Sequence, residues 1–179
     1  MMPIPEVLNV IERYASAYRA LQELQDNNPD LLAVGDQKTG VIGEFYALLY
    51  LKHRYPSAAI TYSENPSQTG WDIKVVPHDY TEPLTIQVKT VSDYSSNRTI
   101  TPISPGWNEL YCLFLDRDLR PTGFWVIDDD SFLAGETRTG LRMRHPNNLA
   151  SGSADIPFGD NRVGELNAIV NQFRNGMNQ

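Results

Sequence analysis

The chain has 179 residues, of which 41% are hydrophobic and 21% are charged. This composition is typical of a folded protein rather than a disordered one, and the length predicts one domain over residues 1–179 with a buried core. The formal net charge of −7 argues against a protein that coats nucleic acid with its whole surface, because such a protein carries an excess of lysine and arginine.

Three features of the sequence bear on where the protein works. No apolar run reaches the roughly 18 residues that a membrane helix needs. The opening "MMPIPEVLNVIERY" lacks the basic start and continuous apolar stretch of a signal peptide. Cys112, in the apolar run "LYCLFLD", predicts a buried, reduced thiol. Together they predict a cytoplasmic protein without membrane association.

Two helices are predicted at the start of the chain. Residues 5–27 form an amphipathic pattern, with apolar side chains at helical spacing: Val7, Ile11, Tyr14, Tyr18, Leu21 and Leu24. The segment "NPDLLAVGD" at 28–36 breaks this pattern. A second helix is predicted from about Thr39 to just before Pro56. Its first turns contain Gly40 and Gly43, which either mark close packing or reflect the tolerance of a helix N-terminus for glycine.

Strands follow the second helix. Residues 58–64, 70–77 and 84–92 are three strand candidates joined by short polar links, which favours antiparallel pairing. Residues 93–108 are polar and contain proline, so they predict a loop. Two further strands, 110–116 and 123–128, flank the turn "RDLRPT".

The end of the chain is less regular. The segment "DDDSFLAG" predicts a short helical turn, and residues 136–162 predict irregular structure. A last helix is predicted at about 160–175, with four residues on one apolar face: Val163, Leu166, Val170 and Phe173. This order of elements predicts an α/β or α+β domain with a mixed sheet flanked by helices, whose central part is residues 39–128.

The strand "LTIQVKTVS" at 84–92 suggests a site as well as a structure. Because side chains alternate along a strand, Gln87 and Lys89 share one face. The preceding strand carries Asp72, and the Val88 carbonyl lies between the two polar residues. Carboxylate, amide and backbone oxygens suit a hard divalent cation, and a nearby lysine assists a water nucleophile in phosphodiester hydrolysis.

Glu44 is the fourth candidate. It interrupts the apolar run "VIGEFYALLYL", and a helical wheel places it with Ala47, Leu48 and Leu51. A carboxylate on an apolar face needs a partner, and a cation at the edge of the sheet is one. The alternatives remain a solvated lysine for Lys89 and an exposed acid near a positive helix N-terminus for Glu44.

The helix with "GVIGEF", followed by "GWDIKVV" and "LTIQVKT", resembles the PD-(D/E)xK superfamily of restriction-endonuclease-like nucleases. The resemblance covers about residues 39–92. It implies that Glu44 is the helix acid, that Asp72 is the metal-binding aspartate and that Lys89 is the catalytic lysine. Gln87 stands where the family usually has an acid, which makes the chain similar to the Q-x-K variant. Trp71 stands where the family has proline.

The resemblance implies a restriction-endonuclease-like fold and a Mg²⁺-dependent DNA endonuclease without an organic cofactor. Mn²⁺ is the alternative cation. Glu44, Asp72, Gln87 and the Val88 carbonyl are the expected ligands. A homodimer is expected, because cutting a duplex with this fold usually takes two active sites, and the N-terminal helix is a candidate interface. Restriction, repair, recombination and mobile-element excision all remain open as the biological role.

Contacts to DNA are expected from the basic residues near irregular structure, which are Arg98, Arg138, Arg142 and Arg144. These arginines alternatively pair with the acids of the chain. Two other functions stay open. The same fold with a weakened site would bind nucleic acid or a protein without cutting it, which the neutral Gln87 favours. An unrelated α+β interaction protein would hold Glu44, Asp72 and Lys89 far apart.

Overall fold

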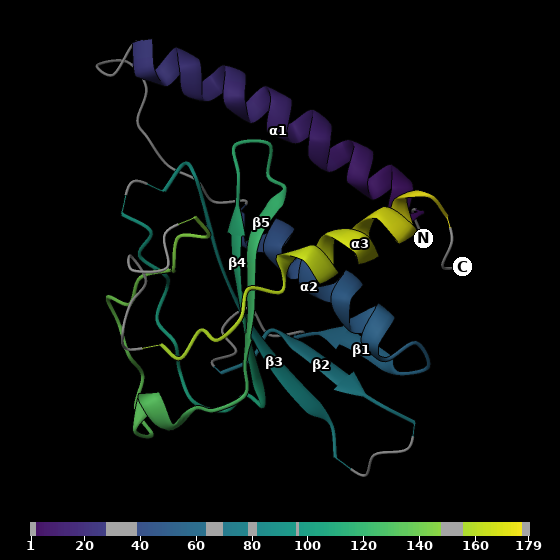
Figure 1. Ribbon diagram of the computed structural model, residues 1–179, viewed down its shortest axis with the longest axis vertical. Coiled ribbons are helices and arrows are strands. Elements are labelled where there is room, and N and C mark those ends of the chain that lie inside the picture. Colours follow the sequence, from purple (N-terminus) through teal and green to yellow (C-terminus); the bar gives the residue numbers. More distant parts are fainter. Residues whose placement is uncertain are drawn as a thin grey trace.

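The computed structural model describes residues 3–27, 39–63, 70–78, 82–95, 97–147 and 156–176, and within them it has a five-stranded sheet and three α-helices (Figure 1). The helices are α1 (Ile4–Asn27), α2 (Thr39–Arg54) and α3 (Val163–Arg174), with a short 3₁₀ helix, η1 (Ser131–Leu133). The strands are β1 (Ala59–Tyr62), β2 (Ile73–Val76), β3 (Leu84–Ser92), β4 (Glu109–Leu115) and β5 (Pro121–Ile127). The predicted break at 28–36 lies outside the described residues.

The sheet has the order β1-β2-β3-β4-β5 and is mixed, as predicted. β1, β2 and β3 pair antiparallel, β3 and β4 pair parallel, and β4 and β5 pair antiparallel. The parallel pair requires a crossover, which residues 93–108 supply without a helix in their described part. β4 is buried along its whole length because it lies inside the sheet with both faces covered.

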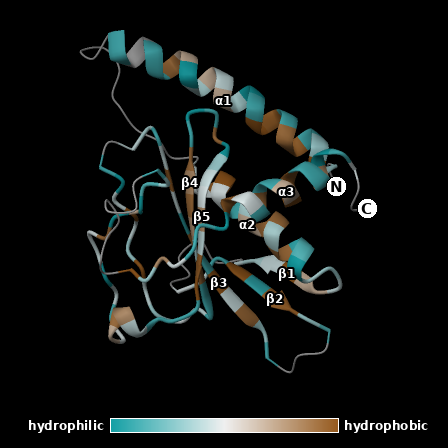
Figure 2. Cartoon of the chain, viewed as in Figure 1, coloured by the Kyte–Doolittle hydropathy of each residue, from teal (hydrophilic) through white to brown (hydrophobic). Residues whose placement is uncertain are grey.

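The two faces of the sheet are covered by different kinds of structure (Figure 1). The three α-helices lie on one face, where Ile86 and Val88 of β3 join the core that they form. Irregular segments before β4 and after β5 cover the other face, where Val91 of β3 joins a second core. Figure 2 shows many hydrophobic residues along the strands and alternating hydrophobic and hydrophilic residues along α1. Because side chains alternate, Gln87 and Lys89 belong to the face with Val91.

α1 is a helix as predicted, but its buried side is shorter than the sequence pattern suggests. Leu8, Ile11 and Ala15 are buried, whereas Leu21, which belongs to the same helical pattern, is 48% exposed. The second half of α1 is held by Tyr18, whose ring packs edge-on against that of Tyr94, with 4.4 Å between the ring centroids. Aromatic and polar contacts therefore replace aliphatic burial there. No helix in the described part of the chain is long and apolar enough to cross a membrane.

α2 comes closest to the sheet at Gly43. A Cβ atom at Gly43 would collide with Thr90 Oγ1 and would lie 2.8 Å from Thr90 Cβ, which is closer than such atoms can approach. The predicted close packing is therefore confirmed at this glycine. A Cβ atom at Gly40 would have no atom within 4 Å, so only the tolerance of the helix start accounts for that glycine. The helix ends with Lys52, His53 and Arg54, basic residues that suit the negative end of its dipole.

We expect Gly43→Ala to lower the free energy of unfolding by about 1–3 kcal/mol, because the new methyl group overpacks the contact with Thr90. Gly40→Ala is the matched control in the same helix, and it should leave stability unchanged or raise it by up to about 1 kcal/mol. Urea denaturation of both variants measures the difference. Thr90→Ala should recover part of the loss in the Gly43→Ala background, and equal losses with either residue at position 90 would contradict the contact.

Candidate active site

Asp72 lies where β2 separates from β3, just before the first residue of β2. Its N–H donates to the Ile86 carbonyl at 2.8 Å, and its carbonyl accepts from Ser63 N at 2.9 Å. The Asp72 carboxylate oxygen Oδ2 accepts a hydrogen bond from Val88 N at 2.7 Å. A side chain therefore takes the place of the next backbone bond of the ladder, which holds the carboxylate in the opening between the two strands.

The same bonds place two of the other predicted ligands. Asp72 bonds to Ile86 through its backbone and to Val88 through its side chain. Gln87 lies between these two residues of β3, so it lies opposite Asp72. The N–H and C=O of one strand residue face the same neighbouring strand, so the Val88 carbonyl also faces the side of β3 where Asp72 lies. Two oxygen-bearing groups predicted from the sequence thus lie on one edge of β3.

Gln87 is a buried polar residue whose side-chain oxygen is an unsatisfied hydrogen-bond acceptor. It is 4% exposed, and its Oε1 atom has no hydrogen-bond partner in the described part of the chain. A buried oxygen without a partner costs about 1–3 kcal/mol relative to the hydrated state. An amide oxygen in this condition, beside a fixed carboxylate, is suited to a ligand that brings positive charge.

Lys89 is half-buried on the same face of β3 as Gln87. Its Nζ atom donates a hydrogen bond to Thr101 Oγ1 at 3.1 Å. Burial lowers the pKa of the Lys89 ammonium, and the negative charges of Asp72 and Glu44 act in the opposite direction. The lysine is therefore close enough to both acids to interact with them electrostatically.

Glu44 approaches the opening between β2 and β3 from the helical face. Its side chain is half-buried on α2, and burial raises the pKa of its carboxyl. The neighbouring charge of Asp72 raises that pKa further, whereas Lys89 lowers it. No hydrogen-bond donor or ion-pair partner contacts the Glu44 carboxylate among the described residues. The structure thus gathers Glu44, Asp72 and Lys89 into one group, which disfavours an interaction protein that holds them apart.

Tyr62 is a neighbour of this group that the sequence did not reveal. It ends β1, pairs with Ile73 across the strands and is 43% exposed. Burial of its hydroxyl and the charge of Glu44 raise the pKa of Tyr62 to about 12. Its position next to Glu44 depends on the pairing of β1 with β2, for which a single tyrosine in a sequence gives no signal.

The group contains two carboxylates, from Glu44 and Asp72. No set of three or more His, Cys, Asp and Glu side chains in the described ranges lies close enough together to hold a metal ion. A cation bound here would take its remaining protein ligands from the amide of Gln87 and the backbone of Val88. Such a set of neutral and acidic oxygens suits Mg²⁺ or Mn²⁺ rather than zinc.

The predicted DNA-contacting arginines lie on two adjoining segments over the face that carries Lys89. Thr99 pairs with Arg142 and Ile103 with Arg138 in antiparallel bridges. Arg138 donates to the Phe132 carbonyl at 3.0 Å. Arg98 has a left-handed backbone, with φ 53°, and is half-buried.

Two more arginines belong to the same segments. Arg144 donates to the Gly159 carbonyl at 3.1 Å and stacks over the ring of Phe158 at 5.0 Å. Arg142 is exposed and uses its Nε atom on the Asn97 carbonyl at 3.0 Å. Arg138 and Arg144 thus support the fold with part of their donors, and Arg142 is the most exposed of the four predicted arginines.

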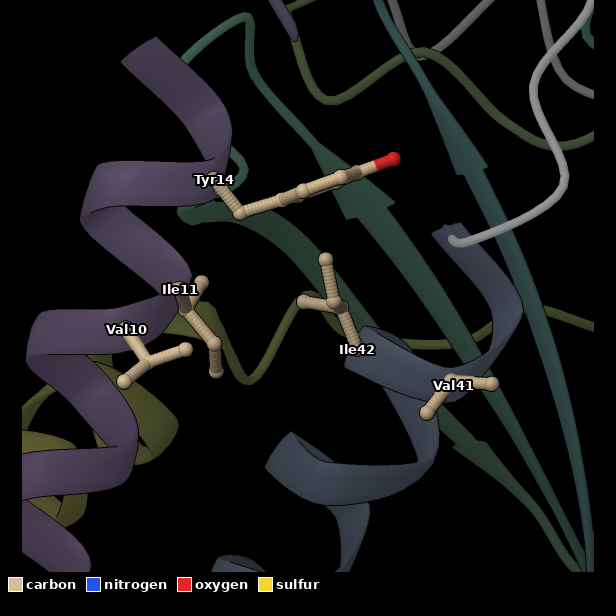
Figure 3. A pocket seen from close by; sticks show the side chains of 5 residues that line it. All are labelled: Val10, Ile11, Tyr14, Val41 and Ile42. Atoms are coloured by element: carbon tan, nitrogen blue, oxygen red, sulfur yellow. The ribbon is translucent and has the colours of Figure 1, made fainter. Parts of the chain in front are cut away.

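A cavity of about 250 Å³ lies between α1 and the first turns of α2 (Figure 3). Val10, Ile11 and Tyr14 of α1 line it together with Val41 and Ile42 of α2. These side chains offer no carboxylate, amide or imidazole, so the cavity is not suited to a metal or a phosphate. The chemistry-bearing residues lie instead at the opening of the sheet.

Comparisons with known proteins give a structural likeness and no match of sequence. No protein-family model matches the chain, and no curated protein matches it. The solved structure of a bacterial homing endonuclease matches with a TM-score of 0.46 and 12% sequence identity. The match covers 80% of this chain and 98% of the endonuclease chain.

We expect Gln87→Leu to raise the free energy of unfolding by about 1 kcal/mol or more in metal-free buffer, because it removes a buried oxygen without a partner. Thermal or urea denaturation in the presence of a chelator measures the change. Gln22→Leu is a control for the exchange of amide for alkyl, in α1, where the Gln22 amide donates to Asp26. A clear loss of stability in Gln87→Leu would show that the Gln87 amide is already satisfied.

Proposed function

We propose that the protein is a metal-dependent DNA endonuclease of the PD-(D/E)xK type, in its Q-x-K variant. The observation that carries the proposal is the buried Gln87 oxygen without a partner in the described part of the chain, next to the fixed carboxylate of Asp72. Glu44 and Lys89 interact electrostatically with Asp72 at the same opening. These are the residue types that phosphodiester hydrolysis requires.

The donor set fits Mg²⁺, with Mn²⁺ as the alternative. Glu44, Asp72, Gln87 and the Val88 carbonyl would hold the cation, since each presents oxygen and the two acids supply negative charge. When bound, the cation neutralises phosphate charge and lowers the pKa of water. Val88 N keeps one oxygen of Asp72 engaged at 2.7 Å, which fixes the direction of the other.

Lys89 has a separate role in the proposed reaction. In hydrolysis, a water oxygen forms a bond to phosphorus, one P–O ester bond breaks, and the leaving oxygen takes up a proton. The Lys89 side chain orients the attacking water; as the neutral amine it accepts the proton that the water gives up, and as the resulting ammonium it offsets the negative charge that develops on the phosphate. Burial lowers the pKa of Lys89, so its neutral form, which can accept a proton, is reached at a lower pH than for an exposed lysine.

DNA is the proposed substrate, with the segments around Arg98 and Arg142 contacting its phosphates. Both segments lie on the face of the sheet that Lys89 occupies, because Thr101, on the segment with Arg98, touches Lys89, and this segment pairs with the one that carries Arg142. A homodimer is the proposed assembly, since two sites are needed to cut two strands. α1 is its proposed interface, as it exposes Val10 beside the apolar cavity.

One observation favours a second candidate function. Gln87 contributes no charge, so the site holds a cation with two formal negative charges from Glu44 and Asp72. A site weakened in this way would leave a module that binds nucleic acid or a protein partner without cutting. Cleavage and binding must therefore be measured on the same preparation.

We expect supercoiled plasmid to be nicked in the presence of Mg²⁺ or Mn²⁺ and not in EDTA. Lys89→Ala should reduce the rate by about 100-fold or more, because it removes the group that assists the nucleophile. Lys74→Ala is the control, since Lys74 lies on the neighbouring strand and on the same face of the sheet. Gel electrophoresis measures cleavage, and fluorescence anisotropy with labelled DNA measures binding.

The outcomes separate the two functions. Binding without cutting by the wild type would favour the binding module. Neither binding nor cutting of DNA would contradict the nuclease and the nucleic-acid-binding module, and would favour a module that binds a protein partner. Equal losses in Lys89→Ala and Lys74→Ala would show that a lysine on this face contributes general positive charge rather than catalysis.

We expect Mg²⁺ to raise the unfolding temperature of the wild type, by an amount equivalent to about 1.4 kcal/mol when the cation is at ten times its Kd. Asp72→Asn should abolish this rise, because it removes half of the formal charge of the site. Gln87→Glu should enlarge it, since it supplies a third carboxylate. Differential scanning calorimetry with NaCl at matched ionic strength is the measurement, and an unchanged rise in Asp72→Asn would place the cation elsewhere.

A further inference from the structure

The ammonium group of Lys89 lies against a hydroxyl from the crossover that joins β3 to β4. Thr101 belongs to residues 93–108, and its Oγ1 atom accepts a hydrogen bond from Lys89 Nζ at 3.1 Å. Within the described part of the chain, the Lys89 ammonium makes this one hydrogen bond and no ion pair. A lysine on a strand next to two acids would ordinarily be expected to bond to one of them.

The segment that presents Thr101 is fixed by its neighbours. Ile100 N donates to the Leu141 carbonyl at 3.0 Å, and Ile103 and Arg138 exchange two backbone hydrogen bonds at 3.0 and 2.9 Å. Ile100 and Ile103, on either side of Thr101, are 4% and 0% exposed. The backbone that carries the exposed Thr101 side chain is therefore held in position by buried neighbours and a backbone ladder.

A fixed acceptor matters because a lysine side chain is long and flexible. Fixing it costs up to about 2 kcal/mol of side-chain entropy. Without an acceptor on its own side, the ammonium is free to move toward Asp72 and Glu44, whose charges attract it. Such an ion pair would place Lys89 where a cation has to bind and would remove it from the position of the attacking water.

We infer that Thr101 is a positioning residue for Lys89. Its hydroxyl keeps the ammonium on the loop-covered face of the sheet and leaves the carboxylates of Asp72 and Glu44 available for a cation. This inference rests on the proposed nuclease function. It adds a residue outside the four predicted from the sequence, and it gives the irregular crossover a role in the site.

The test compares three variants of the full-length chain. Thr101→Val removes the acceptor and keeps a branched side chain, and Thr101→Ser keeps the hydroxyl. Thr99→Val is the matched control, because Thr99 is an exposed threonine on the same segment that bridges to Arg142 rather than to Lys89. Circular dichroism and thermal unfolding first establish that the three variants keep the fold.

The first readout needs neither metal nor DNA. In ¹H–¹⁵N spectra of the lysine ammonium groups, Lys89 should give a protected signal, which Lys89→Ala identifies by its loss. The signal should persist in Thr101→Ser and Thr99→Val and disappear or shift in Thr101→Val, where exchange with water is faster. An unchanged signal in Thr101→Val would overturn the inferred contact.

The second readout is plasmid cleavage at saturating cation. Thr101→Val should lower kcat by about 10-fold or more with little change in KM, since it misplaces a group near the reacting atoms. Thr101→Ser should restore most of the rate. A Thr101→Val protein that cuts at the wild-type rate, or a Thr101→Ser protein as slow as Thr101→Val, would overturn the positioning role.

The two readouts keep the inference apart from the function on which it rests. A wild type that shows the protected Lys89 signal and does not cut would contradict the nuclease and the catalytic purpose of the contact, and it would leave the contact itself established. A wild type that cuts, with cleavage and signal insensitive to Thr101→Val, would contradict the inference and leave the nuclease intact.

Discussion

The hydrogen bond from Val88 N to the Asp72 carboxylate is the interaction on which the candidate site depends. A β-ladder normally continues backbone to backbone, and here a side chain ends it. The ladder of β2 and β3 ends at the pair of Ile73 with Ile86, and the bond fixes a negative charge just beyond that end. Without this bond, β2 would continue as a regular strand beside Gln87, and no fixed carboxylate would lie near the Gln87 oxygen.

The opening is reached from both faces of the sheet. Glu44 comes from α2 on the helical face, and Lys89 extends toward the irregular segments on the other. An acid and a base that came from the same face would be free to neutralise each other. Although they arrive from opposite sides, Glu44 and Lys89 both interact electrostatically with Asp72, while the ammonium bonds to a hydroxyl rather than to a carboxylate.

The sequence was sufficient where the chemistry is local. The alternation of 84–92 predicts β3 with its observed ends, and the apolar neighbours of Glu44 predict its half-buried place on α2. The grouping of Glu44, Asp72 and Lys89 followed from the resemblance to a nuclease family rather than from periodicity. Their roles as metal ligands and catalyst stay predictions.

Other features depend on contacts between distant parts of the chain. Thr101 meets Lys89 only because the crossover returns over the sheet, and loop residues carry no periodic signal for such a return. Tyr62 reaches Glu44 through the pairing of β1 with β2. Leu21 is exposed although it fits the helical pattern of α1. Such a pattern indicates which residues can be buried, and it does not indicate how far the surface that would cover them extends.

The contact between Gly43 and Thr90 has a consequence for how this sequence is able to change over time. Gly43 precedes Glu44 in the chain, and Thr90 follows Lys89, so the closest approach of helix and strand lies one residue from each of two site residues. That contact therefore sets the distance between α2 and β3 at the point where Glu44 and Lys89 lie. Substitutions at 43 and 90 are therefore expected to arise as compensating pairs, because a side chain at 43 would push α2, and Glu44 with it, away from β3.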